Sequence, residues 1–287
     1  ISLSDKQAVT ELLLKSGATI QEMNIVRKNI SEVKGGRLAG HIFPATTICL
    51  VISDVIGDDL RYIASGPTVK DDASTREAAV GILRHYDILD KIPLEVRKHL
   101  ECINSQGIPE PEVFDRVHNF LIATNRTAVS EMARYALLMK LKPIILSHGL
   151  KGESRLAGKR FASFLVALKE LKDEDIWVVL SAGEPTVRVE GSGKGGRNQE
   201  FVLSGIETLI EGTAVISIGT DGIDGASDAA GAVADGSTYT KVKELDLNME
   251  KYLQENDSHH FFQQIDDLIF TGPTGTNVSD IQIGIVL

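Results

Sequence analysis

The sequence predicts an α/β protein of two domains, and three features of its 287 residues support this prediction. The length suits two domains, since single domains usually span about 100–200 residues. Residues 104–116 place Gly107, Pro109 and Pro111 among polar residues, which is typical of a linker. Beyond it, apolar runs alternate with amphipathic stretches of about 15 residues, the pattern of a parallel sheet wrapped by helices. We therefore place the domains at residues 1–113 and 114–287.

The first domain is expected to contain helices around one buried strand. A helix is predicted over Ser4–Lys15, with Ser4 as its N-cap, and apolar residues at helical spacing predict a second over 20–30. Residues 45–52 form a continuous apolar stretch, which predicts a strand buried on both faces. Cys49 within it is expected to be a buried, reduced thiol. Further helices are predicted over residues 74–85 and 94–103.

The second domain is expected to alternate strands and helices along the chain. Strands are predicted over residues 120–123, 143–147, 176–181, 186–190, 214–218, 268–271 and 281–286. Helices are predicted over residues 126–140, 153–171 and 198–209, and two shorter helical pieces follow nearer the C-terminus. Ligands of such sheets bind at the carboxyl ends of the strands, so the polar loops after these strands are the first candidates for a site.

Composition argues against several classes of partner. The formal net charge is −10 and the sequence pI is about 5.2, so the average field repels nucleic acid and anionic membranes. No apolar run approaches the ~18 residues of a membrane span, and there is no secretory start. Two cysteines are too few for a disulfide framework. We expect a cytoplasmic protein that binds neither nucleic acid nor membrane and captures anionic substrates with a few local donors.

The strongest motif is the glycine-rich segment 191–200, GSGKGGRNQE, which precedes a predicted helix. Glycines let backbone N–H groups approach an oxyanion, and the helix start adds about half a positive charge. Arg197 supplies a planar guanidinium suited to a carboxylate or phosphate. We expect an anion to bind here, in contact with Gly195, Gly196, Arg197, Asn198 and Gln199. A flexible turn with a solvated Arg197 is the alternative.

The same segment matches two nucleotide motifs only superficially. It contains the spacing G-x-G-x-x-G, but it lies late in the domain and lacks an acidic residue about 20 positions further on. A Walker A loop is excluded, because Gly195 follows Gly193-Lys194 where Ser or Thr is required.

A second polar loop, residues 219–231, follows the predicted strand 214–218 and carries three carboxylates. Asp221 and Asp224 could hold Mg²⁺ through one or two oxygens while phosphates fill the other positions. The acidic spacing does not fit an EF-hand. A plain acidic turn that caps the next helix is the alternative reading.

Other polar loops supply further candidates. Residues 271–280 form a hydroxyl-rich and amide-rich cradle with the candidates Gly272, Thr274, Thr276 and Asn277, although Asn277 and Asp280 could equally be turn formers. Asp54 ends a predicted strand and is a candidate base or metal ligand, and Glu184 ends another. The segment Lys34-Gly35-Gly36-Arg37 repeats residues 194–197, which adds Lys34 and Arg37, and a nearby glycine turn adds Ser65. The adjacent His259 and His260 cannot face one metal from a helix and are read as surface or packing residues.

These motifs together resemble the class II glycerate 2-kinases. The segments 195–200, 219–231 and 271–277 are similar to the C-terminal MOFRL domain of that family. Residues 14–18, 24–28, 34–37, 53–58 and 64–67 resemble the latter half of its N-terminal domain. The resemblance spans the whole chain.

The resemblance implies a remnant of a Rossmann-like N-terminal domain followed by a smaller α/β domain of the MOFRL type. It implies ATP- and Mg²⁺-dependent phosphorylation of D-glycerate at its 2-hydroxyl, giving 2-phosphoglycerate, with Arg197 as the family's important arginine. The family's important lysine and a Ser-Gly-Gly-Gly-Ser loop would precede Ile1. We therefore expect an N-terminally truncated chain that needs its missing segment as a partner and for activity, and that could form a homodimer.

Two other functions stay open on the sequence. One is an NAD(P)H-dependent hydroxypyruvate or tartronate-semialdehyde reductase, which would use residues 191–196 for the dinucleotide. The other is a non-enzymatic module that binds a phosphorylated metabolite. For the kinase, we predict Arg197, Asp221 and Asp54 as the catalytic residues.

Overall fold

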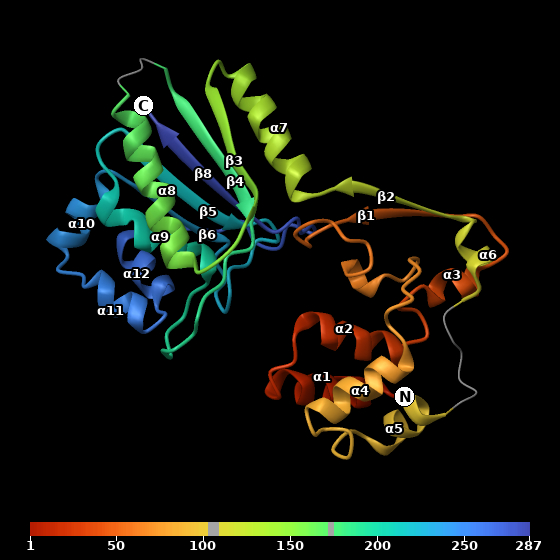
Figure 1. Ribbon diagram of the computed structural model, residues 1–287. Coiled ribbons are helices and arrows are strands. Elements are labelled where there is room, and N and C mark those ends of the chain that lie inside the picture. The colour runs from red at the N-terminus through yellow and green to blue at the C-terminus, as the bar shows by residue number, and fades with distance from the viewer. Residues whose placement is uncertain (103–108, 172–174) are drawn as a thin grey trace. The chain divides into compact units, whose positions relative to one another are not determined.

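The computed structural model describes residues 1–102, 109–171 and 175–287, and it divides the chain into two compact units. Unit 1 contains residues 1–51 and 58–122, and unit 2 contains residues 52–57 and 123–287. Figure 1 shows the elements of each unit. The mixed helices and strands confirm the predicted α/β class.

The predicted boundary at residues 113 and 114 lies within unit 1. The chain stays with this unit because strand β2 (Val117–Ala123) pairs with strand β1 (Thr47–Ile52) in a two-stranded sheet. Part of the predicted linker and the last residue of the helix predicted over 94–103 fall at residues 103–108, outside the described residues.

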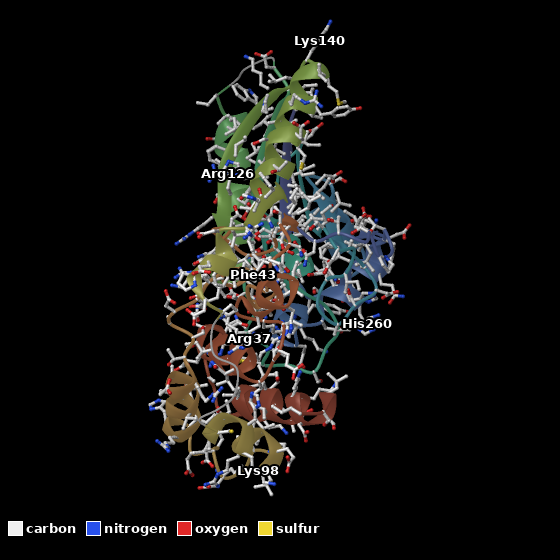
Figure 2. The ribbon with its side chains drawn as sticks, turned by 90° about the vertical axis from the view of Figure 1, so that its right-hand side faces the viewer. Arg37, Phe43, Lys98, Arg126, Lys140 and His260 are labelled. Atoms are coloured by element: carbon white, nitrogen blue, oxygen red, sulfur yellow. The ribbon has the colours of Figure 1, made fainter. Side chains whose placement is uncertain are left out.

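The helices of unit 1 begin where the sequence offers side-chain caps. Ser2 and Asp5 form a capping box for the first helix, two residues before the predicted N-cap, and Thr19 and Glu22 form one for the second. Buried Leu13, Val26 and Leu83 belong to the apolar core between these helices. The helices are α1 (Leu3–Lys15), α2 (Ile20–Asn29), α3 (Arg37–Ile42), α4 (Arg76–His85), α5 (Leu94–Glu101) and α6 (Pro111–Phe114). Figure 2 labels Arg37 on α3 and Lys98 on α5.

The strand β1 is not buried on both faces, contrary to the prediction. Its side chains alternate between half-buried and exposed, and Ile48 and Leu50 are 68% and 64% exposed. Cys49 is half-buried rather than buried. The apolar run was read as a central strand, but a two-stranded sheet leaves one face of β1 open. A Rossmann-like sheet therefore stays a prediction for this unit.

Unit 2 is built on a six-stranded sheet with the order β3-β4-β8-β5-β6-β7. The strands are β3 (Lys142–Leu150), β4 (Trp177–Gly183), β5 (Thr213–Gly219), β6 (Gly231–Asp235), β7 (Leu268–Ile269) and β8 (Asp280–Val286). The prediction of a parallel sheet is wrong, because β3 and β4 are parallel whereas β8 runs antiparallel to both of its neighbours. The last strand inserts between β4 and β5 rather than joining an edge, and β6 also runs antiparallel to both of its neighbours.

Helices cover this sheet from both faces. On one face, Phe161 of α8 (Ser154–Lys169) and Phe201 of α9 (Arg197–Gly205) pack with Val215 of β5. On the other face, Val129 of α7 (Asn125–Leu138) packs with Leu180 of β4. The remaining helices are α10 (Thr238–Glu244), α11 (Met249–Gln254) and α12 (Ser258–Ile265), with a short 3₁₀ turn at Ile206–Thr208. No helix in the described ranges is long and apolar enough to cross a membrane.

The strand predicted over residues 186–190 does not form. Only Thr186 makes a β-bridge, to Glu153, and Val189 is 73% exposed. Alternating valines suggested a half-buried strand, but the Glu190 N–H donates to the Asn256 side chain at 2.8 Å instead of joining a sheet.

Candidate functional site

Three strand ends meet at one edge of the six-stranded sheet. Asp280, the first residue of β8, lies in register with Gly183 at the end of β4 and with Gly219 at the end of β5. The segments that follow β4 and β5 and the segment that precedes β8 therefore share this edge. It is the edge at which the sequence predicted a ligand site.

The structure brings the three polar loops of the prediction together here. The Thr274 N–H donates to the Asp221 carbonyl at 3.2 Å, and its hydroxyl donates to the Thr220 carbonyl at 2.6 Å. The Ala226 N–H donates to the Gly195 carbonyl at 3.2 Å. The loops 191–197, 219–228 and 271–279 are thus joined by backbone contacts into one surface of unit 2.

Asp224 is the centre of this junction, and it has a structural role. Its Oδ1 accepts hydrogen bonds from the N–H and side-chain amide of Asn198, and its Oδ2 accepts the equivalent pair from Gln199. All four lie at 2.9–3.1 Å. Burial raises the pKa of Asp224, although these four donors oppose the shift. The Asp224 carboxylate therefore caps the N-terminus of α9, although it lies in a different segment of the chain.

This geometry corrects three assignments made from the sequence. Both carboxylate oxygens of Asp224 accept hydrogen bonds from four donors, and the residue is 2% exposed, so we withdraw it as a metal ligand. Asn198 and Gln199 are also buried, and they direct their amides at Asp224 rather than at a ligand. The alternative, an acidic turn that caps the next helix, is correct only in part, because Asp224 caps α9, which precedes this loop in the chain, and not α10, which follows it.

The glycines of segment 191–197 are required by packing against protein. An added Cβ at Gly191 would lie 2.3 Å from the Glu255 backbone, and one at Gly193 would lie 2.4 Å from Asp257. Cβ atoms at Gly195 and Gly196 would lie 2.2 Å from Ser258 Oγ and 2.4 Å from Asp224. We predicted that these glycines leave room for an oxyanion. Protein atoms fill the space beside them instead.

The connection between α11 and α12 holds the glycine-rich segment in place. Asn256 Oδ1 accepts the N–H groups of Glu190 and Gly191, and Asp257 Oδ1 accepts the Lys194 N–H at 2.9 Å. Asn256 also donates to the buried Glu200 carboxylate at 2.7 Å, which in turn pairs with Arg155. Several amides that could have faced a phosphate are thus occupied within the protein.

Arg197 is the cation that this framework presents at the sheet edge. It is the first residue of α9 and is about one-third exposed. Its Nε and Nη2 donate to the two oxygens of Asp280 at 2.5 and 3.1 Å, and its Nη1 donates to Glu184 Oε1 at 2.9 Å. The alternative of a solvated Arg197 is therefore incorrect, since all three guanidinium nitrogens donate to carboxylates.

Asp280 is the residue of this candidate site that sequence reasoning missed. It was read as a possible turn former, yet its side chain is 2% exposed and pairs side-on with Arg197. Burial raises the pKa of Asp280 to about 6, even though the Arg197 guanidinium opposes the shift. A carboxylate at the first position of a buried strand was the available signal, since such a group needs a charged partner.

Asp54 joins the same edge from far away in the sequence. Its Oδ2 accepts a long hydrogen bond from the Asn277 amide at 3.4 Å, and its carbonyl accepts the Ser279 hydroxyl at 2.7 Å. The Thr220 hydroxyl lies 3.4 Å from Asn277 Oδ1. The prediction grouped Asp54 and Asn277 as candidates, and both lie on this surface of unit 2.

Asp221 is the remaining acidic candidate of the site. It is half-buried, and its Oδ1 accepts the Ile223 N–H at 3.1 Å. Gly272 and Thr276 are exposed on the neighbouring loop. Within the described ranges, no cluster of three or more His, Cys, Asp or Glu side chains is arranged as a metal site. Asp221 and Asp54 thus offer at most isolated carboxylate ligands.

The candidates of unit 1 gather around a second pair of glycine turns. The Gly35 N–H donates to the Ser65 carbonyl at 3.0 Å, and Lys34 Nζ donates to the Ala64 carbonyl at 3.0 Å. Ala64 and Ser65 both have left-handed backbone angles, with φ of 50° and 63°. Such strained residues persist where surrounding structure imposes them, and they often mark ligand-binding turns.

Two of these unit 1 candidates serve the fold rather than a ligand. Arg37 is buried, and its Nη1 donates to the carbonyls of Lys28 and Lys34 at 2.9 and 3.1 Å. The Ser65 hydroxyl is buried and donates to Asn24 Oδ1 at 3.1 Å. We therefore withdraw Arg37 and Ser65 as direct phosphate ligands, and Lys34 stays a candidate.

The histidine pair behaves as the sequence predicted. His259 is buried, and its Nε2 lies 3.1 Å from Asp228, which also accepts from Lys194. His260, labelled in Figure 2, is exposed. Its Nδ1 lies 2.6 Å from Asp257 Oδ1. The two rings are perpendicular and contact different carboxylates.

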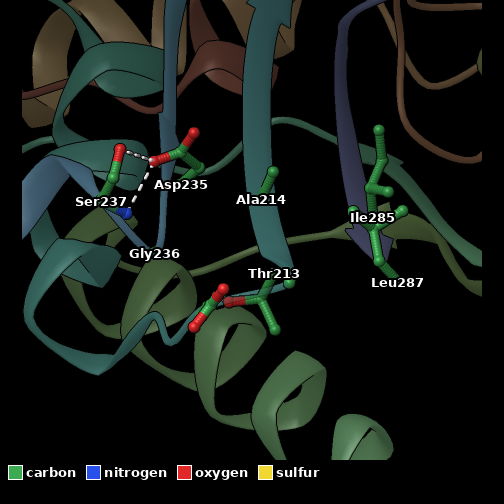
Figure 3. A pocket seen from close by; sticks show the side chains of 9 residues that line it. Thr213, Ala214, Asp235, Gly236, Ser237, Ile285 and Leu287 are labelled. Atoms are coloured by element: carbon green, nitrogen blue, oxygen red, sulfur yellow. Dashed lines mark hydrogen bonds between the residues drawn. The ribbon is translucent and has the colours of Figure 1, made fainter.

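A hollow of about 420 Å³ lies at the opposite end of the strands, away from this site (Figure 3). It is lined by Thr213 at the start of β5, by Asp235 at the end of β6 and by Leu287. Asp235 accepts hydrogen bonds from the Ser237 N–H and hydroxyl at 2.8 and 2.7 Å. Thr213 at the start of β5 lines the hollow, and Gly219 at its end lies beside the Arg197 site. The hollow and the Arg197 site are therefore at opposite ends of the strands.

Comparison with known proteins gives a family for both parts of the chain. Residues 1–101 match a family model described as a domain of unknown function, DUF4147. Residues 177–280 match the MOFRL family. The MOFRL match covers Arg197, the acidic loop and Asp280.

Named relatives match the chain from end to end. A glycerate 2-kinase from Pyrococcus horikoshii is 46% identical over 100% of this chain and 66% of its own length. The crystal structure of a glycerate kinase from Thermotoga maritima has a TM-score of 0.88 at 39% identity, covering 100% of this chain and 68% of that one. A relative from Agrobacterium vitis carries the provisional name hydroxypyruvate reductase. It is 40% identical over 98% of this chain and 73% of its own length. The chain spans about two thirds of the length of these relatives.

We predict that Gly191→Ala destabilises unit 2 by about 2–3 kcal/mol, because a methyl group cannot fit 2.3 Å from the Glu255 backbone. Urea unfolding followed through the fluorescence of Trp177, the single tryptophan, measures this change. Gly149→Ala is the matched control, since its Cβ would meet only the movable Ile56 side chain at 3.3 Å, and it should cost less than about 1 kcal/mol. Equal stability of the Gly191 variant and wild type would show that the segment is not pinned.

We also predict a pH dependence that belongs to Asp280. Burial raises the pKa of Asp280 from 3.8 to about 6, so between these values the folded protein holds a proton that the unfolded chain has lost. The unfolding free energy of wild type, relative to Asp280→Asn, should therefore fall by about 1–2 kcal/mol as the pH rises from about 4 to about 6. Urea unfolding at several pH values tests this. A difference that is constant or rises with pH contradicts it.

Proposed function

Because the chain belongs to the glycerate kinase family that combines DUF4147 and MOFRL domains, we propose that it serves in the ATP-dependent phosphorylation of D-glycerate at the 2-hydroxyl. The products are 2-phosphoglycerate and ADP. The observation that carries the proposal is the guanidinium of Arg197, held at a sheet edge where three polar loops converge.

In this reaction the 2-hydroxyl oxygen of glycerate forms a bond to the γ-phosphorus of ATP, and the bond from that phosphorus to ADP breaks. Such transfers depend mainly on positioning and on compensation of negative charge. Arg197 has the fork geometry to bind an oxyanion of either substrate. Asp54 is exposed at the same edge and is our candidate acceptor for the hydroxyl proton.

Mg²⁺ fits the donors of this edge in a limited way. Mg²⁺ in kinases uses one or two protein carboxylates and takes its other ligands from water and phosphate. Asp221 is the carboxylate that would hold it, with one of its oxygens in a hydrogen bond to the Ile223 N–H, because Asp54 is assigned to the hydroxyl proton. The ion would compensate charge on the phosphates of ATP.

Further features of the proposal concern the setting and the partners of the chain. We propose a cytoplasmic setting and glycerate as the small-molecule partner. A homodimer and an association with a separate N-terminal segment stay predictions. Lys34 of unit 1 is proposed as a phosphate ligand, because its ammonium lies beside the left-handed turn at Ala64 and Ser65, where it donates to the Ala64 carbonyl at 3.0 Å.

Replacement of Arg197 tests the assigned role. In the natural full-length protein, Arg197→Ala should lower turnover of glycerate by about 100-fold or more, since a charged donor to the transferred group is lost. Arg197→Lys, which keeps a charge beside the buried Asp280, should fold normally and still lose most activity, because it cannot pair side-on. A coupled assay of ADP release measures both. Arg188→Ala, at an exposed arginine paired with Glu190, is the control and should stay active. Near-normal turnover of Arg197→Lys and Arg197→Ala contradicts the role.

Ligand binding separates the kinase from the reductase. The packing of residues 191–196 against Glu255 and Asp257 leaves these glycines close to protein rather than to a dinucleotide. We therefore expect ATP with Mg²⁺ to raise the thermal unfolding temperature, and NADH or NADPH to leave it unchanged. Stabilisation by NADH, with none by ATP, would favour the reductase instead.

A further inference from the structure

The two carboxylates on Arg197 are held very differently. Asp280 takes Nε and Nη2 with both of its oxygens, in the side-on arrangement that gives the strongest pairs. Its side chain is 2% exposed, so it cannot leave without burying an unpaired charge. Glu184 contacts only Nη1, with a single oxygen, and its side chain is 48% exposed.

Glu184 can leave Arg197 without a change in the main chain. Its N–H donates to the Leu150 carbonyl at 2.9 Å, which anchors its backbone beside β3. Pro185 after it is buried. A rotation of the Glu184 side chain into solvent therefore frees Nη1 while the loop stays in place.

The charges at this position oppose the entry of an anion while Glu184 is present. One guanidinium faces two carboxylates, which gives one positive and two negative charges and a local sum of −1. A further carboxylate placed beside Nη1 would be repelled by Glu184 at close range. Departure of Glu184 returns the local sum to zero and leaves one N–H donor exposed.

We propose that Glu184 is a place-holder for the substrate: its carboxylate occupies the position on Arg197 Nη1 that the carboxylate of a small hydroxy acid takes on binding. The inference rests on the proposed function for the identity of that acid. Oε1 of Glu184, 2.9 Å from Nη1, marks where the substrate oxygen binds. Asp280 acts as a positioning residue, because it fixes the guanidinium in both states.

The place-holder sets the affinity and selectivity of the site. A ligand must displace an exposed ion pair, which is worth up to about 1 kcal/mol and so lowers affinity by up to about five-fold. Only ligands that make further contacts at this edge can recover that loss. Glu184 therefore discriminates against simple anions that contact Nη1 alone.

Isothermal titration calorimetry of the purified protein with D-glycerate tests the inference. Glu184→Gln keeps the size of the side chain but removes the charge, so it should bind glycerate about five-fold more tightly than wild type. Glu131→Gln is the matched control, since Glu131 forms an exposed pair with Arg134 on α7, and it should bind as wild type does. An unchanged unfolding midpoint of Glu184→Gln excludes a general structural effect.

Unchanged or weaker binding of glycerate by Glu184→Gln would overturn the inference. The same titrations with inorganic phosphate, which needs no assumption about the substrate, keep it separate from the proposed function. If neither protein binds glycerate, the proposed function fails, while tighter phosphate binding by Glu184→Gln still supports the place-holder. If phosphate also binds no more tightly to the variant, the place-holder is wrong.

Discussion

The site depends on one buried carboxylate, that of Asp224. It caps helix α9 although it lies in the loop after β5, distant from α9 in the sequence. The Asp224 side chain is 2% exposed, and its burial is tolerated because four donors from Asn198 and Gln199 surround it. That requirement fixes the start of α9 against the loop after β5. Arg197 is the residue immediately before these donors, so its backbone position is determined by the same contacts. The cation of the site is therefore placed by a group that never contacts a ligand.

The packing of the glycine-rich segment follows from this constraint. Gly196 must lie against Asp224, and Gly191 and Gly193 must lie against the connection between α11 and α12. Side chains at these positions would push the segment away from Asn256 and Asp257, whose oxygens satisfy its amides. The glycine-rich motif thus serves mainly to hold residues 191–197 in a fixed position against the protein. The role that we propose in catalysis belongs to a side chain at the end of the motif, Arg197.

The sequence predicted the α/β class and the convergence of three loops, because strand ends and polar turns are local signals. It could not predict that β8 inserts between β4 and β5, since strand order is decided by contacts distant in sequence. The same limit explains the errors within the site. Asp224 and Asp280 differ in role only because one faces amides and the other a guanidinium. Asp54 was found as a candidate, but nothing local indicated that it would lie beside Asn277.

A glycine-rich helix start is compatible with two physical situations, and the sequence alone does not separate them. Either a ligand approaches the backbone, or another part of the protein does, and both exclude a Cβ atom. The partner of the amides decides between them: free N–H groups indicate a ligand, whereas N–H groups bonded to Asn256, Asp257 and Asp224 indicate internal packing. In this chain the second situation holds for most of the segment. The anion recognition that we propose therefore rests on the Arg197 side chain, whose strength as a ligand is set by the carboxylates of Asp280 and Glu184 that already contact it.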